Sequence, residues 1–328
     1  MRYNIALVGC GAIAKGFYLP ALAKHRAKFD KAWLIDLNDA ALSAASAVVR
    51  AEKAHQLSEI ADELQFVVVA TPNSSHFPLA WDALLRGAHV LIEKPYVIRP
   101  GDGRKLIQLA AERGRIVAVN QTRRFFPHAR ELRQRISAGE FGALKSVVHL
   151  EGEKLAWPFE SGAAFARTAQ RTGVIMDLGV HVLDFYHYLL RPSWAFVSAI
   201  HDGFEGPEGL ATLNLEANGA PVKIRLSRYQ KQKNTAQLYF ERATLHVNIH
   251  DLNAYAVEKT PGAIERVIVQ PMVTKYEVLG EQLLANFVAA GLGQETPGCD
   301  AASSTPVIEL LDKIYLSAGR YPAKIGAV

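Results

Sequence analysis

The chain has 328 residues, of which 49% are hydrophobic and 21% are charged, and its formal net charge is +5. This length and composition indicate a globular protein of two domains and exclude an intrinsically disordered one. No apolar run reaches the roughly 20 residues that span a bilayer, and Cys10 and Cys299 have no partner at metal-ligand spacing. We therefore expect neither a membrane protein nor a metal site. The first residues show no secretory signal pattern, and we expect a cytoplasmic location.

The most basic segment, residues 123–135, opens a pattern that is typical of an amphipathic helix. A nucleic-acid-binding surface would need such a patch to recur over one face or to lie in a known motif. We interpret the segment as a solvated helix face and expect no nucleic-acid partner. Part of it could still meet an acidic substrate or the pyrophosphate of a cofactor.

The first 121 residues alternate between short apolar runs and helical patterns. The runs predict strands at residues 5–8, 32–35, 66–70, 89–92 and 116–119. Helices are predicted to include residues 40–54, 75–86 and 102–113. Because the strand runs lack polar alternation, they are typical of a parallel sheet that is covered on both faces. Residues 1–121 are thus predicted to form a doubly wound α/β domain.

The pattern changes after residue 121. A helix is predicted at residues 127–138, with Gly139 as its C-terminal cap, and another at residues 176–190. Strands are predicted at residues 144–150, 195–200, 210–215, 222–227, 237–240 and 244–249, and closing helices at residues 276–291 and 304–318. Successive strands with short turns favour an antiparallel sheet, so residues 122–328 are predicted to form an α+β domain. The closing helices could pack back on the first domain.

A glycine-rich turn stands between the first predicted strand and the first helix. Residues 9–14 match the dinucleotide-binding fingerprint, with alanine at its third small position. Gly9 allows the tight turn, and Gly11 lets backbone N–H groups approach a pyrophosphate. The N-terminus of the helix that follows supplies donors and a partial positive charge, and we expect Ala12 and Ile13 at the cofactor as well. This position at the first strand-to-helix junction predicts that the turn binds a dinucleotide.

Asp36 ends the second predicted strand, where the adenosine ribose of a dinucleotide should lie. A carboxylate there accepts hydrogen bonds from the two ribose hydroxyls. It also repels a 2′-phosphate, by about 4 kcal/mol at 4 Å and an effective dielectric near 20. The sequence therefore predicts NAD, with NADP disfavoured. The alternative is that Asp36 or Asn38 merely caps the following helix.

Thr71, Pro72, Asn73 and His76 follow the strand at residues 66–70. In an open α/β sheet, ligands bind beyond the carboxyl ends of the strands, so we expect these four residues at the cofactor. Two alternatives remain open: Asn73 could simply cap the helix, and His76 could simply pack in its first turn.

Glu93 and Lys94 end the next strand and are followed by Pro95. We place Glu93 at the cofactor as well. A lysine at this point could meet an oxygen bound beside the nicotinamide, and the proline favours an extended backbone at Lys94. Seen in isolation, however, a lysine at a strand end is usually just solvated.

In the second domain, Asp177, His181 and Asp184 are spaced to lie on one face of a helix. A carboxylate and an imidazole one turn apart can hydrogen-bond, which orients the ring and stabilises its charged form. The alternative is a capping Asp177 beside a structural histidine. A metal site is less favoured, because no HExxH string accompanies the pair.

Taken together, these segments resemble the glucose-fructose oxidoreductase, inositol dehydrogenase and MocA-like family over nearly the whole chain. The matching segments are residues 9–14, 70–72 with His76, 93–95, 124–125 with Pro127, 139–142 and 173–184. The sequence departs from the family at residues 171–173, Arg-Thr-Gly, where relatives often carry a glycine pair or triplet.

The resemblance implies a Rossmann domain followed by a domain with a large, mostly antiparallel open sheet, whose open face mediates homodimers or homotetramers. It implies Lys94, Asp177 and His181 as catalytic residues that also bind substrate. We expect Arg124 and Trp157 in the substrate site as well, although Trp157 could equally be a core or interface residue. The substrate expected from the family is a sugar, a cyclitol, a nucleotide-linked sugar or the matching keto-sugar.

In the mechanism this predicts, His181 takes the hydroxyl proton while the carbon gives hydride to the nicotinamide. Lys94 stabilises the developing alkoxide, and Asp177 orients His181 or a neighbouring substrate hydroxyl. One alternative is a glycoside hydrolase that retains NAD and oxidises its sugar transiently. Another is a non-catalytic, NAD-sensing regulatory protein, which the retained Lys94, Asp177 and His181 argue against.

Overall fold

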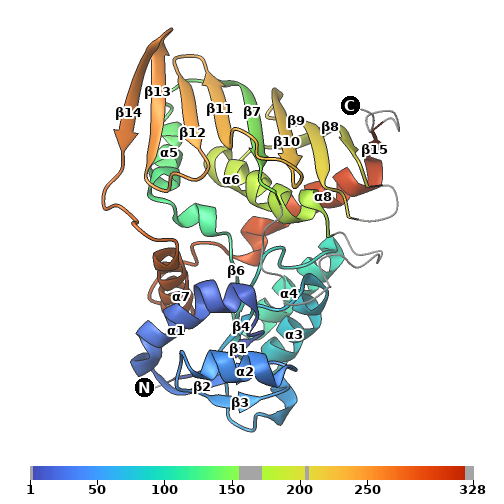
Figure 1. Ribbon diagram of the computed structural model, residues 1–328, viewed down its shortest axis with the longest axis vertical. Coiled ribbons are helices and arrows are strands. Elements are labelled where there is room, and N and C mark those ends of the chain that lie inside the picture. Colours follow the sequence, from blue (N-terminus) through green and yellow to red (C-terminus); the bar gives the residue numbers. More distant parts are fainter. Residues whose placement is uncertain (1–2, 155–171, 204–206, 322–328) are drawn as a thin grey trace. The chain divides into compact units, whose positions relative to one another are not determined.

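The computed structural model describes residues 3–154, 172–203 and 207–321, which form two compact units (Figure 1). The first unit contains residues 3–125 and 274–308, and the second contains the remaining described residues. None of the helices in the described part of the chain is long and apolar enough to cross a membrane.

The first unit is built on a six-stranded parallel sheet with the strand order β3-β2-β1-β4-β5-β6. The strands are β1 (Tyr3–Val8), β2 (Phe29–Ile35), β3 (Glu52–Ala54), β4 (Phe66–Val69), β5 (His89–Ile92) and β6 (Val117–Val119). Every residue of β4 is buried, as expected of a central strand covered on both faces. The predicted doubly wound α/β fold is confirmed.

Helices follow the strands of this sheet in turn. They are α1 (Leu19–His25), α2 (Asp39–Ser46), α3 (Asn73–Leu85) and α4 (Pro100–Glu112). A π-helical segment, Ala14–Tyr18, leads into α1, and such segments often mark functional sites. The later helix α7 (Glu277–Gly291) also belongs to this unit, where it packs against α1.

The prediction of one helix over residues 40–54 was wrong. Helix α2 ends at Ser46, and residues 52–54 form the edge strand β3. Two of the three residues of β3, Glu52 and Lys53, are exposed, so the strand has no apolar run that could distinguish it in the sequence. It pairs with β2 alone and so lies at the end of the sheet.

The second unit carries a nine-stranded sheet with the order β14-β13-β12-β11-β7-β10-β9-β8-β15. Its strands are β7 (Leu144–Gly152), β8 (Trp194–His201), β9 (Leu210–Ala217), β10 (Ala220–Ser227), β11 (Thr235–Phe240), β12 (Thr244–Asn248), β13 (Ala254–Thr260), β14 (Ala263–Ile268) and β15 (Gly319–Arg320). Neighbouring strands are antiparallel except for the pairs β7–β10 and β8–β15. The predicted large, mostly antiparallel sheet is confirmed, although the sequence did not predict β13, β14 or β15.

Helices α5 (Pro127–Ser137) and α6 (Val180–Leu190) pack against each other on one face of this sheet (Figure 1). A π-helical segment, Ile175–Gly179, leads into α6. The last helix, α8 (Ala301–Ser317), begins in the first unit and ends in the second.

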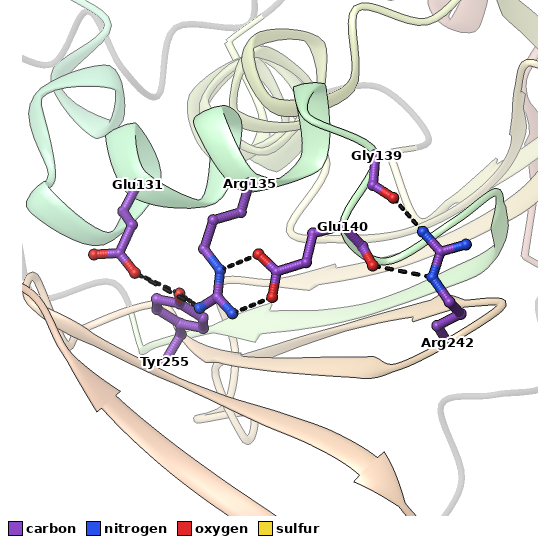
Figure 2. A network of polar contacts seen from close by, with 6 residues as sticks. All are labelled: Glu131, Arg135, Gly139, Glu140, Arg242 and Tyr255. Carbon is purple, nitrogen blue, oxygen red and sulfur yellow. Dashed lines mark hydrogen bonds and ion pairs between the residues drawn. The ribbon is translucent and has the colours of Figure 1, made fainter.

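A polar network joins the end of α5 to the strands (Figure 2). The Arg135 guanidinium forms two hydrogen bonds, 2.7 and 2.5 Å long, with the Glu140 carboxylate, and it also contacts the Tyr255 hydroxyl on β13. Arg242, in the turn between β11 and β12, donates to the carbonyls of Gly139 and Glu140. The segment 139–142, one of those that carry the family resemblance, therefore has a structural role in this unit.

Candidate active site

The glycine turn of the first unit has a tight backbone that requires glycine at its first position. Gly9 has a φ of +95°, and a Cβ atom there would lie 2.5 Å from the carbonyl oxygen of Ala70. No residue with a side chain fits this position without moving the backbone. The next residue, Cys10, is fully buried, and burial raises the pKa of its thiol to about 12, so the turn holds an inert thiol.

Beyond this turn, Gly11, Ala12 and Ile13 are half-buried. Ala12 and Ile13 are helical, and the Gly11 carbonyl accepts the Lys15 amide at 3.0 Å. The partly open backbone at this helix start suits a phosphate group.

Asp36 faces the glycine turn. One of its carboxylate oxygens accepts the Cys10 amide at 2.8 Å, and the other accepts the Asn38 amide at 2.9 Å. The cap of α2 is Asn38, whose side chain accepts the amides of Ala40 and Ala41. Asp36 therefore is not the cap of α2, and it remains half-buried at the end of β2.

The loop after β4 is linked to the loop after β5 by a buried histidine. The two ring nitrogens of His76 each lie 2.8 Å from a carbonyl oxygen, Nε2 from that of Thr71 and Nδ1 from that of Pro95. Burial lowers the pKa of His76, and a neutral ring can donate to one of the two carbonyls. Because His76 is 0% exposed, its effect on a cofactor would be exerted through these two loops.

Pro72 and Asn73 form the start of α3. Pro72 is the N-cap residue, and no side chain provides a capping hydrogen bond there, so the Asn73 amide is not used as a cap. Asn73 is half-buried and Pro72 is exposed. Both thus lie at the carboxyl end of β4, as the sequence predicts.

Glu93 belongs to a buried hydrogen-bond network. Its Oε1 accepts the Tyr18 hydroxyl at 2.7 Å and the Asn120 amide at 2.6 Å, and its Oε2 accepts the backbone N–H of Lys94 at 3.1 Å. Burial and the neighbouring Glu93 carboxylate raise the pKa of Tyr18, which keeps its hydroxyl a donor. The carboxylate is thus engaged by groups of this unit and fixes the backbone at Lys94.

Lys94 differs from its neighbours in exposure. Within residues 90–97, all of which the structure describes, every other residue is buried and Lys94 is half-buried. The end of β5 therefore presents one partly exposed side chain, and it carries a positive charge.

Helix α6 and the π-helical segment before it show the same pattern of a few half-buried side chains among buried ones. Within residues 173–186, Asp177 and His181 are half-buried and all the others are buried. Asp184, which was expected on the same face, is 1% exposed. Asp177 lies in the π-helical segment, forms an ion pair with Arg228, and does not cap the helix. Lys94 belongs to the first unit, whereas Asp177 and His181 belong to the second.

Two expected substrate-site residues have different outcomes. Arg124 is 6% exposed, and its guanidinium donates to the hydroxyl of Ser303 at 2.9 Å and to its carbonyl at 3.2 Å. Trp157 lies outside the residues that the structure describes, as does Arg171 of the divergent loop.

Sequence reasoning did not single out Tyr18, Asn120 or Arg228. Asn120 follows the carboxyl end of β6, so the rule that located Lys94 would also have located it. Tyr18 is a buried residue within a helical pattern, and Arg228 follows β10 in a basic segment. No local sequence signal separates either of them from ordinary residues of the same type.

Comparison with known proteins decides the family. The family model described as "Oxidoreductase family, NAD-binding Rossmann fold" matches residues 3–121. The model of the GFO/IDH/MocA C-terminal domain matches residues 129–246. The chain belongs to the GFO/IDH/MocA family. The resemblance found in the sequence is thereby confirmed.

Two relatives similar to this chain have names that give a position on a sugar. The UDP-N-acetylglucosamine 3-dehydrogenase of Acidithiobacillus ferrooxidans is 28% identical over 300 residues, which cover 87% of this chain and 88% of the relative. The D-glucoside 3-dehydrogenase of Escherichia coli is 26% identical over 195 residues, which cover 57% of this chain and 54% of the relative.

Solved structures share the fold over nearly the whole length. KijD10, a 3-ketoreductase from Actinomadura kijaniata in complex with NADP and TDP-benzene, has a TM-score of 0.83 at 19% identity, covering 98% of this chain and 100% of that chain. The WlbA dehydrogenase of Bordetella pertussis, in complex with NADH and UDP-GlcNAcA, has a TM-score of 0.79 at 22% identity, covering 97% and 96%. At these identities the likeness shows the fold alone.

Proposed function

We propose that the protein transfers a hydride between NAD and a secondary alcohol, or the matching ketone, of a sugar, a cyclitol or a nucleotide-linked sugar. The observation that carries the proposal is the exposure of three side chains. Lys94, Asp177 and His181 are each half-buried within segments whose other residues are buried. As a member of its family, the chain is an oxidoreductase that acts on CH–OH groups, in keeping with the names of its relatives.

The chemistry of the three side chains suits this reaction. The imidazole of His181 takes the hydroxyl proton during oxidation and returns it during reduction. The ammonium of Lys94 stabilises the charge that develops on the same oxygen. Asp177 orients His181 or a neighbouring substrate hydroxyl. The nicotinamide, when bound, supplies the hydride acceptor.

The first unit fits a dinucleotide. A Cβ at Gly9 would collide with the carbonyl of Ala70, so glycine is what allows this tight turn, and the half-buried backbone of Gly11 to Ile13 is where a pyrophosphate would lie. Asp36 favours NAD over NADP, because its carboxylate would face the ribose and repel a 2′-phosphate. Similar structures are known with NADP and with NADH, so the preference of this chain rests on Asp36 itself.

Assays of reduction and oxidation test the proposal directly. The protein is mixed with NAD and a panel of sugars, cyclitols and nucleotide-linked sugars, or with NADH and the keto-sugars, and absorbance at the NADH band is followed. We expect turnover with at least one member and a preference for NAD over NADP. Glycoside cleavage without added NAD and without net NADH would instead indicate a hydrolase that retains its cofactor. Binding of NAD without turnover over the whole panel would indicate a sensor and contradict the proposal.

We further propose that the open face of the nine-stranded sheet joins two or four copies of the chain. Residues of β9 and β11 alternate between buried and half-buried, so one face packs on helices while the other presents side chains such as Thr235, Gln237 and Tyr239. Light scattering after size exclusion should give two or four times the mass of the chain, and Tyr239→Glu should lower it. A wild-type monomer would contradict this.

A further inference from the structure

The helix that carries Asp177 and His181 begins against two side chains from distant parts of the second unit. We propose that Glu208 and Arg228 are positioning residues, which fix the first turn of this helix and the carboxylate of Asp177. The inference rests on the proposed function, because it assumes that Asp177 and His181 act on substrate. It goes beyond that function by naming what holds them in place.

Glu208 takes the place of an N-terminal cap. The first N–H groups of a helix lack partners within it, and the N-cap residue here, Val174, offers no side-chain oxygen. Glu208 Oε1 accepts the backbone N–H of Ile175 at 3.0 Å, and its carbonyl accepts that of Val174 at 2.7 Å. A negative charge at this end of a helix is also favourable.

The Glu208 carboxylate is itself fixed. It is 5% exposed, and the Tyr315 hydroxyl on α8 donates to the same Oε1 at 2.6 Å. Gly173 provides the space for it, since a Cβ at Gly173 would lie 2.1 Å from the carboxyl carbon of Glu208. A side chain at position 173 would therefore displace the Glu208 carboxylate.

Arg228, which directly follows β10, holds Asp177. Its guanidinium forms an ion pair with the Asp177 carboxylate, with 23% and 37% of the respective side chains exposed. Its backbone N–H donates to the Gly209 carbonyl at 2.7 Å, directly beside Glu208. The antiparallel pair β9–β10 ends at this point, so both positioning residues are anchored to the same end of one strand pair.

Together the two contacts determine where Asp177 and His181 lie. Glu208 fixes the backbone two residues before Asp177, and Arg228 fixes the carboxylate of Asp177 itself. Since His181 follows on the same helix, a shift of the first turn would displace both functional side chains. Displacements of about 1 Å at a catalytic group can lower turnover by about 100-fold.

The experiment compares Glu208→Ala, Glu208→Gln, Arg228→Gln and Arg228→Lys with the wild-type protein. The control is Glu140→Gln, which weakens the Arg135–Glu140 ion pair of the same unit without touching Asp177 or His181. For each variant, kcat, KM, the Kd of NAD, the melting temperature and the NMR signals of the His181 ring are measured. The assay temperature is kept well below every melting temperature.

We expect Glu208→Ala and Arg228→Gln to lower kcat at least about tenfold, with the Kd of NAD changed less than about twofold. Glu208→Gln and Arg228→Lys should restore part of the loss, because the amide oxygen can still accept from Ile175 and the ammonium still pairs with Asp177. The His181 signals should shift in Glu208→Ala and stay in place in Glu140→Gln.

A lower melting temperature with unchanged kcat and unchanged His181 signals would show that Glu208 and Arg228 are merely structural, and would overturn the inference. The NMR readout does not depend on turnover. If the wild-type protein turned over no substrate while the His181 signals still shifted, the proposed function would fail and the positioning role of Glu208 would stand.

Discussion

In the part of the chain that the structure describes, two helices begin with a π-helical segment, yet they are held in different ways. The segment Ala14–Tyr18 follows a turn in which Gly9 has a positive φ and packs so closely on Ala70 that a Cβ would not fit. The segment Ile175–Gly179 is held by side chains, the carboxylate of Glu208 and the guanidinium of Arg228. The first arrangement depends on the absence of a side chain at Gly9, and the second on side chains that come from distant parts of the sequence. A site of the first kind can be recognised in the sequence, and a site of the second kind cannot.

The largest expected effect separates chemistry from cofactor binding. Lys94→Ala and His181→Ala should each lower kcat at least roughly 100-fold, because they remove an oxyanion donor and a general base. The affinity for NAD, measured by quenching of protein fluorescence, should stay within about threefold of the wild-type value. Near-normal turnover in both variants would contradict the assigned roles.

The next effect concerns the glycine turn, where a substitution should weaken NAD binding and leave the catalytic side chains in place. Gly9→Ala forces a Cβ against Ala70 and places alanine at a positive φ, at a combined cost of at least about 2 kcal/mol. We expect the turn to relax away from this conformation in the variant, so that NAD binding has to restore it, and NAD affinity should fall roughly 30-fold in titration calorimetry. The His181 NMR signals should not move. An unchanged affinity for NAD would mean that this turn does not hold the dinucleotide.

A smaller effect is expected at the ribose. Asp36→Asn keeps the size of the side chain and removes the charge that would repel a 2′-phosphate. The ratio of NAD to NADP affinity should fall about tenfold, or by about 1.4 kcal/mol. Parallel titrations with the two cofactors measure it. A wild-type preference for NADP would refute the role given to Asp36.

The smallest effect concerns the buried network around Glu93. Tyr18→Phe removes one hydrogen bond to this carboxylate, which should lower the free energy of unfolding by about 1 kcal/mol in urea titrations. Turnover should fall a few-fold, since the remaining Asn120 contact still holds the carboxylate that fixes the Lys94 backbone. No loss of stability would mean that Glu93 finds another donor.

Much of the fold could be predicted because it follows local patterns. Buried strands such as β4 give continuous apolar runs, and the glycine turn gives a spacing that few other structures require. The edge strand β3 was missed because its exposed Glu52 and Lys53 resemble a helix surface. The exposed strand β14, which includes Ile264 and Ile268, was missed because it has no buried face to impose a pattern.

The candidate site could be predicted more fully in the first unit than in the second. The position of Lys94 after a buried strand follows from the general placement of ligands at strand ends. The pair of Asp177 and His181 could be seen from its spacing, but its support could not. Glu208 and Arg228 lie 33 and 51 residues away from the groups they bind, and pairing of β9 with β10 brings them to the helix.

The most direct test of the central claim is transfer of deuterium. A substrate found in the panel is prepared with deuterium on the carbon that bears the reacting hydroxyl, and NAD is analysed by mass spectrometry after a single turnover. The account predicts NADH heavier by one mass unit, formed by the wild-type protein and at most about 1% as fast by His181→Ala. Unlabelled NADH, or equal rates in the two proteins, would contradict it.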